Sequence, residues 1–255
     1  MCETCGCSIP HEHRPSNPMS YSAGDFAEPD HTVTVLRDLL SENDHLARHN
    51  RAHFHEHGVL AINLMSSPGS GKTSLIEATI KHLQGKLGIA VIEGDLETEN
   101  DAMRIRAHGV VAIQITTGSA CHLDAHMVHH ALHRLDLTDI DILFIENVGN
   151  LVCPASFDLG QHHNVVLLSV TEGDDKPAKY PVMFRGADLV VLTKTDLLPH
   201  LDGFDPRQAE NNLRALANTA PVFPLSTRSR DGKGDGMAAW IGWLETANKN
   251  RTPVQ

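Results

Sequence analysis

The fold is decided by the stretch Ser66-Ser-Pro-Gly-Ser-Gly-Lys-Thr-Ser74. An apolar run from Val59 to Met65 precedes it, and residues 74–83 have the apolar spacing of an amphipathic helix. A buried strand, a turn with glycines, a Lys-Thr pair and a helix form the context that a phosphate-binding loop requires. Ser66 stands where the common pattern GxxxxGK(S/T) has its first glycine, so the first turn departs from that pattern.

The chemistry of this loop predicts a bound nucleotide with Mg²⁺. Glycines at 69 and 71 let backbone N–H groups approach an anion closely, and the following helix directs its positive dipole end to the same place. We expect Lys72 to reach the β- and γ-phosphates and the Thr73 hydroxyl to bind Mg²⁺. The predicted nucleotide contacts of the loop are Ser67, Gly69, Ser70, Gly71, Lys72, Thr73 and Ser74.

Two later predicted strands end in acidic residues. Residues 89–95 end in Asp95, and residues 140–146 end in Glu146. Open α/β sheets bind ligands at the carboxyl ends of their strands, so we expect Asp95 to hold Mg²⁺ together with Thr73, directly or through water. The predicted catalytic set is Lys72, Thr73, Asp95 and Glu146.

A base-recognition pattern follows the predicted strand 187–193, in the form Thr193-Lys-Thr-Asp196. An aspartate at a strand tip accepts hydrogen bonds from guanine N1 and its 2-amino group, which adenine cannot offer. Lys194 is expected to pack its stem on the base plane, and Ser226 lies in a second candidate base-edge loop. Thr193 replaces the Asn of the usual N-K-x-D motif, but together with the phosphate loop the pattern favours GTP over ATP.

The N-terminal segment carries three thiols, Cys2, Cys5 and Cys7, within six residues. Thiolates are soft ligands for zinc, nickel or copper(I), and removal of Met1 would free an amine as a fourth ligand. Three thiolates and an amine suit square-planar nickel better than zinc. We expect residues 1–32 to form a flexible metal-binding tail, because they show almost no apolar periodicity.

A second metal set is predicted from Cys121, His122 and Cys153. If the strands before them are neighbours, all three project from the ligand edge of the sheet, and two thiolates with an imidazole suit zinc or nickel. His126 and His130 follow at helical spacing and are possible additional ligands. The histidines between 45 and 57 could bind metal weakly as a store. Their pattern fits a solvated polar helix face better.

Length and composition limit the class of protein. At 255 residues the chain holds one α/β domain and a tail, and its formal charge of −11 argues against nucleic-acid binding. We find neither a membrane-spanning apolar run nor an N-terminal secretory signal. Five cysteines, three of them crowded together, suggest metal chemistry in a reducing compartment, so we expect a cytoplasmic protein.

The predicted fold class is α/β, a P-loop NTPase with a mostly parallel sheet flanked by helices. The domain is expected to span residues 33–248, beginning with a helix within 33–58, and residues 249–255 are expected to fray.

These motifs together resemble the HypB family, GTPases that help to load nickel into nickel–iron hydrogenase. The resemblance rests on the cysteine tip, the phosphate loop and four further stretches, Glu93-Gly-Asp95, Cys121-His-Leu-Asp124, Glu146-Asn-Val-Gly-Asn-Leu-Val-Cys-Pro154 and Thr171-Glu-Gly-Asp-Asp-Lys-Pro177. It implies slow GTP hydrolysis to GDP and phosphate, with GTP state coupled to metal binding and dimerisation.

The resemblance also implies partners and ligands. These are a homodimer across the nucleotide and metal face, a HypA-type nickel chaperone and the hydrogenase large-subunit precursor. The tip cysteines match the family's nickel motif, and Cys121, His122 and Cys153 match its interface site for nickel or zinc. The residues alone leave three alternatives open: a metal store, a GTPase serving another metalloenzyme such as urease, and a small-molecule kinase.

Overall fold

The computed structural model describes residues 29–228 and 236–251, with side chains from residue 40 onward. The chain divides into two units, Met1–Arg37 and Asp38–Gln255, and the sheet belongs to the second. The predicted tail cysteines Cys2, Cys5 and Cys7 lie outside the described residues. Helix α1 begins at Pro29, four residues before the predicted boundary of the tail.

The described residues form one sheet in which every strand pair is parallel, with the order β3-β2-β4-β1-β5-β6-β7. The strands are β1 (Leu60–Ser66), β2 (Ile89–Asp95), β3 (Val111–Thr116), β4 (Ile142–Glu146), β5 (His163–Ser169), β6 (Leu189–Thr193) and β7 (Val222–Pro224). The predicted fold class, a parallel P-loop sheet flanked by helices, is confirmed.

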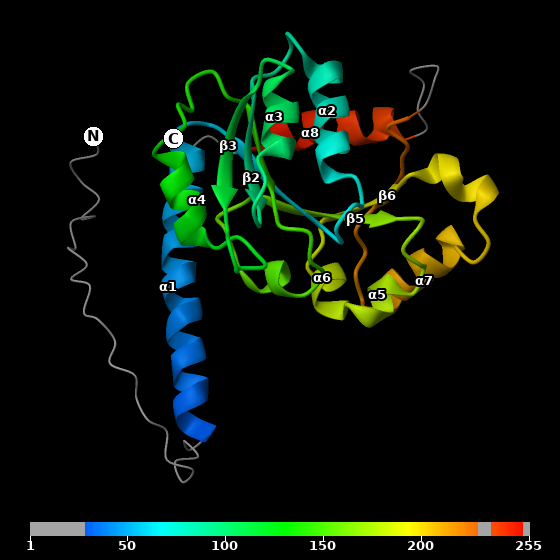
Figure 1. Cartoon of the computed structure of the whole chain (residues 1–255), viewed down its shortest axis with the longest axis horizontal. Coiled ribbons are helices and arrows are strands. Elements are labelled where there is room, and N and C mark those ends of the chain that lie inside the picture. Colours follow the sequence, from blue (N-terminus) through cyan, green and yellow to red (C-terminus); the bar gives the residue numbers. More distant parts are fainter. Residues whose placement is uncertain (1–28, 229–235, 252–255) are drawn as a thin grey trace. The chain divides into compact units, whose positions relative to one another are not determined.

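Helices cover both faces of this sheet (Figure 1). They are α1 (Pro29–Glu56), α2 (Lys72–Leu83), α3 (Asn100–Arg106), α4 (Ala125–Leu132), α5 (Lys176–Lys179), α6 (Pro181–Arg185), α7 (Pro206–Ala215) and α8 (Met237–Asn250), with the 3₁₀ turns η1 (Cys153–Ser156) and η2 (Thr195–His200). The polar segment 171–181 contains the single turn α5, which begins beside Pro177.

Successive side chains of the central strand β1 point to opposite faces of the sheet. Leu60, Ile62 and Leu64 pack with α2, α3 and α8 in one core. Ala61 packs on the opposite face with α1 and α4, and Met65 packs there with α6 and α7. Because both faces are buried, strands such as β4 and β6 consist almost entirely of apolar residues.

Helix α8 continues two residues past the predicted domain end at 248. Beyond it, Arg251 donates a hydrogen bond to the Asp141 carbonyl at 2.7 Å and forms an ion pair with its carboxylate. These contacts anchor the first part of the segment that was expected to fray. Within the described ranges, no helix combines the length and apolar character that a membrane crossing needs.

Candidate functional site

The phosphate loop joins β1 to α2 in the predicted way. Gly69 and Gly71 have positive φ angles of 73° and 99°, which glycine adopts without the strain that a Cβ brings. Ser66, at the position of the usual first glycine, is fully buried. Its Oγ accepts a hydrogen bond from Lys72 Nζ at 3.2 Å, so the serine holds the lysine side chain across the loop.

A cavity of about 360 Å³ extends from this loop to the predicted base-recognition segment. It is lined by Gly69, Ser70, Gly71, Ser74, Thr193, Lys194, Asp196, Leu197, Thr227 and Arg228. Ser226 Oγ donates to Asp196 Oδ1 at 2.6 Å and so orients that carboxylate. The cavity therefore joins Lys194 and Asp196 to four of the predicted loop contacts, Gly69, Ser70, Gly71 and Ser74, whereas Ser67, Lys72 and Thr73 do not line it.

Thr193 has a defined contact in place of the Asn of the common motif. Its Oγ1 donates to the Ser70 carbonyl at 2.6 Å and is buried with the rest of the side chain. This hydrogen bond ties the end of β6 to the phosphate loop. The next residue, Lys194, adopts a left-handed φ of 59°, which turns the chain into η2.

Glu172 is a contact of the phosphate loop that we did not predict. Ser67 Oγ donates to its Oε2 at 2.7 Å, and Ser70 Oγ donates to its Oε1. The Ser169 N–H also donates to this carboxylate, at 3.3 Å. One acidic side chain therefore fixes two loop serines to the end of β5. The sequence feature that could have indicated Glu172 is the polar run 171–177, which directly follows a buried strand.

A pair of buried acids lies behind the loop. Thr73 Oγ1 donates to Glu146 Oε1 at 2.8 Å, and Glu146 is paired in register with Glu93 of the adjacent strand. Burial raises the pKa of Glu146 to about 7, although the charge of Lys72 opposes this rise. Burial and the neighbouring Glu146 raise the pKa of Glu93 to about 8. Glu93 was not predicted as a site residue; its signal was an acid within an otherwise apolar strand.

The donor set around these acids fits a magnesium ion. Glu93 Oε2 and Glu146 Oε2 are buried and have no hydrogen-bond partner in the part of the chain that is described. Buried oxygens without partners are costly, and Mg²⁺ binds hydroxyl and carboxylate oxygens. Asp95, the predicted ligand, instead accepts hydrogen bonds at Oδ2 from Thr98 N and Oγ1. Its role with Mg²⁺ stays a prediction.

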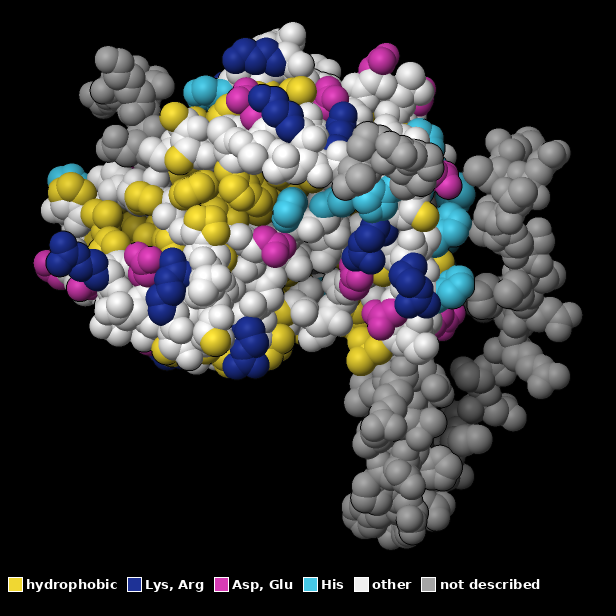
Figure 2. Space-filling view, turned by 180° about the vertical axis from the view of Figure 1, so that it is seen from behind, with side chains coloured by type: hydrophobic (Ala, Val, Ile, Leu, Met, Phe, Trp, Pro, Cys, Tyr) yellow, Lys and Arg dark blue, Asp and Glu magenta, His cyan; other side chains and the backbone are white. Residues whose placement is uncertain are grey.

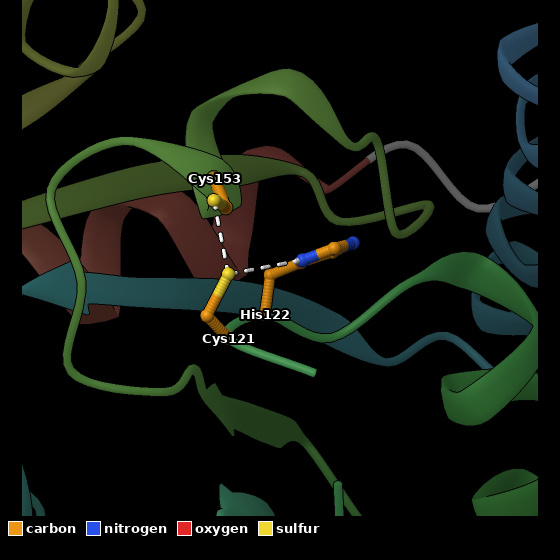
Figure 3. Close-up of side chains that lie close together, drawn as sticks. All are labelled: Cys121, His122 and Cys153. Carbon is orange, nitrogen blue, oxygen red and sulfur yellow. Dashed lines mark hydrogen bonds between the residues drawn. The ribbon is translucent and has the colours of Figure 1, made fainter. Parts of the chain in front are cut away.

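Cys121, His122 and Cys153 come together as predicted (Figure 3), with their ligand atoms within 4.8 Å of one another. The Cys121 thiol donates to Cys153 Sγ at 3.0 Å, and Cys121 Sγ lies 3.9 Å from His122 Nδ1. The close approach of the Cys121 sulfur raises the pKa of the Cys153 thiol, whereas burial lowers the pKa of His122. The His122 ring stacks on Phe157 at 4.0 Å, which limits its orientation.

The strands that lead to these ligands are not neighbours, contrary to the condition in the prediction. β2 lies between β3 and β4, so the loop after β3 crosses the end of β2. Gly94 allows this crossing, because a Cβ at this position would lie 2.7 Å from the Leu123 side chain. The Leu123 N–H then donates to Asn147 Oδ1 at 3.0 Å, which joins the β3 loop to the loop after β4.

The possible ligands His126 and His130 do not join this group. They face each other on α4, with their Nε2 atoms 3.1 Å apart. The only groups of three or more ligands found among the described residues are Cys121 with His122 and Cys153, and His53 with Glu56 and His57.

Comparison with known proteins identifies the family of this chain. The family model for the CobW/HypB/UreG nucleotide-binding domain matches residues 60–224. The chain is 54% identical over 219 residues to the hydrogenase maturation factor HypB of Azotobacter vinelandii, covering 86% of this chain and 71% of that protein.

Two solved structures are also similar. The crystal structure of HypB from Helicobacter pylori in complex with nickel has a TM-score of 0.76 and 40% identity, covering 84% of this chain and 99% of that one. HypB from Archaeoglobus fulgidus has a TM-score of 0.75 and 41% identity, covering 82% and 100%. With its phosphate loop and its Cys-His-Cys group (Cys121, His122 and Cys153), the chain belongs to the HypB family of hydrogenase maturation factors.

Proposed function

We propose that this protein is a GTP-hydrolysing nickel carrier that delivers nickel to the precursor of the hydrogenase large subunit. Nickel is the cargo, held by Cys121, His122 and Cys153, and the nucleotide state alters how tightly it is held. The similar Helicobacter pylori protein was solved with nickel, and two thiolates with an imidazole suit nickel or zinc.

One observation carries the coupling: the loop after β4 contacts the phosphate loop at one end and the metal ligands at the other. Gly149 packs closely on Pro68: a Cβ added at Gly149 would lie 2.8 Å from the Pro68 Cα. In the next residue, Asn150 Nδ2 donates to the Cys121 carbonyl at 3.3 Å, and Asn150 Oδ1 accepts from Val152 N at 2.8 Å. A shift of the phosphate loop therefore has a direct route to both cysteines.

Hydrolysis would follow the usual logic of phosphoryl transfer, in which positioning and charge neutralisation dominate. Lys72 would bind the β- and γ-phosphates. Thr73 and Glu146 would hold Mg²⁺ together with Glu93, which lies beside Glu146. When bound, Mg²⁺ neutralises charge that develops on the phosphates. Asp196 would select guanine, since its carboxylate is oriented by Ser226. Slow turnover is expected without a partner that completes the site.

The metal group also favours a second copy of the chain. Three ligands leave a coordination position open, and Val152, beside Cys153, is 60% exposed. We therefore propose a homodimer across the nucleotide and metal face, with zinc as an alternative occupant. A HypA-type chaperone would supply nickel, directly or through Cys2, Cys5 and Cys7 of the N-terminal segment.

The test is a nickel titration of the Cys2/Cys5/Cys7→Ala chain with Mg·GDP and with Mg and a non-hydrolysable GTP analogue. We expect the ion at Cys121, His122 and Cys153 to change its affinity by at least about fivefold between the two nucleotides, because coupling energies between sites are typically 1–3 kcal/mol. The Lys72→Ala version serves as the control and should lose that difference. Equal nickel affinity in both nucleotide states would show that the nucleotide acts on something other than this metal site.

A further inference from the structure

A second group of histidines lies where α1 and α4 pack together, apart from the Cys-His-Cys group. His49 and His53 lie on α1 and His57 directly follows it, while His126, His129 and His130 lie on α4 and His133 directly follows it. Spacings of three and four place each set along one side of its helix. Figure 2 shows histidine side chains gathered on the side of the molecule where α1 runs. We call this surface the histidine face.

His129 is held in a form that suits a metal ligand. It is only 8% exposed, and its Nδ1 lies 3.2 Å from Asn50 Oδ1. Asn50 uses its NH₂ group for the carbonyls of Ala125 and Leu159, so its oxygen faces the ring as an acceptor. His129 Nδ1 must therefore carry the proton, which leaves a lone pair on Nε2. Such a hydrogen bond to the distal nitrogen is the usual support of a metal-bound imidazole.

That lone pair points at a second imidazole. His129 Nε2 and His133 Nε2 are 3.1 Å apart, one helical turn from each other. Two nitrogens bound to one ion at about 2.0–2.1 Å lie about 2.9 Å apart at a right angle and about 3.3 Å apart at the tetrahedral angle. The observed separation falls between these values, so an ion can replace the shared proton with little movement.

Helix α1 offers further ligands beside this pair. The His49 ring meets the His129 ring edge-on at 4.9 Å. One turn on, the ligand atoms of His53, Glu56 and His57 lie within 4.8 Å of one another. His57 Nδ1 contacts the His53 carbonyl at 3.0 Å, which again leaves Nε2 free for a metal.

We propose that the histidine face binds a divalent transition-metal ion through His53, Glu56 and His57, whose ligand atoms already lie together, with His129 and His133 as an adjoining ligand pair. Imidazole ligands select ions such as Ni²⁺, Zn²⁺ and Cu²⁺ over Mg²⁺ and Ca²⁺. The site contains no thiolate and uses no residue of the nucleotide cavity. The proposal can therefore be tested independently of the proposed function.

The test uses the full chain with all five cysteines replaced by serine, which removes both thiolate groups. We expect isothermal titration with Ni²⁺ to show one bound ion. His53→Gln with His133→Gln should weaken it at least tenfold, because each of the two ligand groups loses an imidazole. The matched control is His82→Gln on α2, whose ring is also exposed and bonds the carbonyl four residues earlier at 2.8 Å. The control should leave the affinity unchanged.

A second measurement avoids the cysteine substitutions. In the intact chain, Zn²⁺ added beyond the amount that fills the thiolates should shift the side-chain ¹⁵N resonances of His129 and His133, but not that of His82. Unshifted resonances, or nickel affinity equal in the double variant and the His82 control, would overturn the proposal.

Discussion

The Cys-His-Cys group and the histidine face are assembled by different means. The first takes its ligands from two loops, those after β3 and β4, and the second of these loops packs on the phosphate loop through Gly149. The second takes its ligands from two helices, and its supporting residue Asn50 bonds the start of α4 and the Leu159 carbonyl.

This difference predicts which of the two metal sites changes its affinity when a nucleotide binds. Loops change shape when a ligand binds, whereas packed helices keep their ligand spacing. We therefore expect metal affinity at the Cys-His-Cys group to depend on nucleotide and affinity at the histidine face to be constant.

The largest expected effect comes from Cys153→Ser, which removes one of two thiolates. We expect nickel affinity at the Cys-His-Cys group to fall roughly 10³-fold, since changes even to outer-shell partners typically cost 10–100-fold. Binding at the histidine face should persist without nucleotide dependence. Nickel titration with each nucleotide checks this, and a nucleotide-dependent affinity that survives the substitution would break the comparison.

Gly149→Ala tests the contact between the two loops. The added Cβ would lie 2.8 Å from Pro68 Cα, so we expect a loss of about 1–3 kcal/mol in unfolding free energy and a smaller nucleotide effect on nickel. Gly242→Ala in α8, where a Cβ meets nothing within 4 Å, is the control and should stabilise by about 0.5–1 kcal/mol. Chemical denaturation and nickel titration measure the two effects, and unchanged coupling in Gly149→Ala would exclude this route.

His162, which lies outside the histidine face, makes a contribution to stability that acid removes. His162 Nδ1 accepts a hydrogen bond from Ala61 N at 3.0 Å, and burial lowers the pKa of His162 from 6.5 to about 4. The unfolded chain therefore binds the extra proton first, so this contribution is present above pH 6.5 and is lost as the pH falls towards 4. Between pH 7.5 and pH 5 the full shift corresponds to about 2 kcal/mol, and solvent screening of this partly exposed ring reduces the loss to about 1 kcal/mol.

Urea denaturation at these two pH values measures this loss. His162→Gln should reduce the pH dependence by about that amount, while His82→Gln, an exposed control, should not. If His162→Gln kept the full dependence, other groups would account for it.

Thr193→Val gives the smallest expected effect. It removes the hydrogen bond to the Ser70 carbonyl, which is worth about 1 kcal/mol, and should weaken GTP binding about fivefold without changing metal binding at the histidine face. Thr193→Asn, which restores the common motif, should bind GTP as the parent does. Fluorescent nucleotide titration checks both variants, and a changed nickel affinity at the histidine face would contradict the separation.

Much of the fold could be predicted because its signals are local. The strand 89–95 was placed without error, and the phosphate loop was placed between the correct strand and helix. Helix ends were missed by a few residues where side-chain anchoring decides them, as with Arg251 beyond α8. Glu172 and Glu93 were missed because their roles depend on neighbours distant in sequence.

The sequence by itself determined the phosphate loop, the parallel α/β class and the residue types of the Cys-His-Cys group, because each depends on short-range spacing or on residue chemistry. Only the tertiary structure decided that β2 separates β3 from β4, that Gly94 and Gly149 let two loops meet, and that α1 and α4 bring their histidines together. These features depend on strand order and on close approach between distant segments, which local periodicity does not encode.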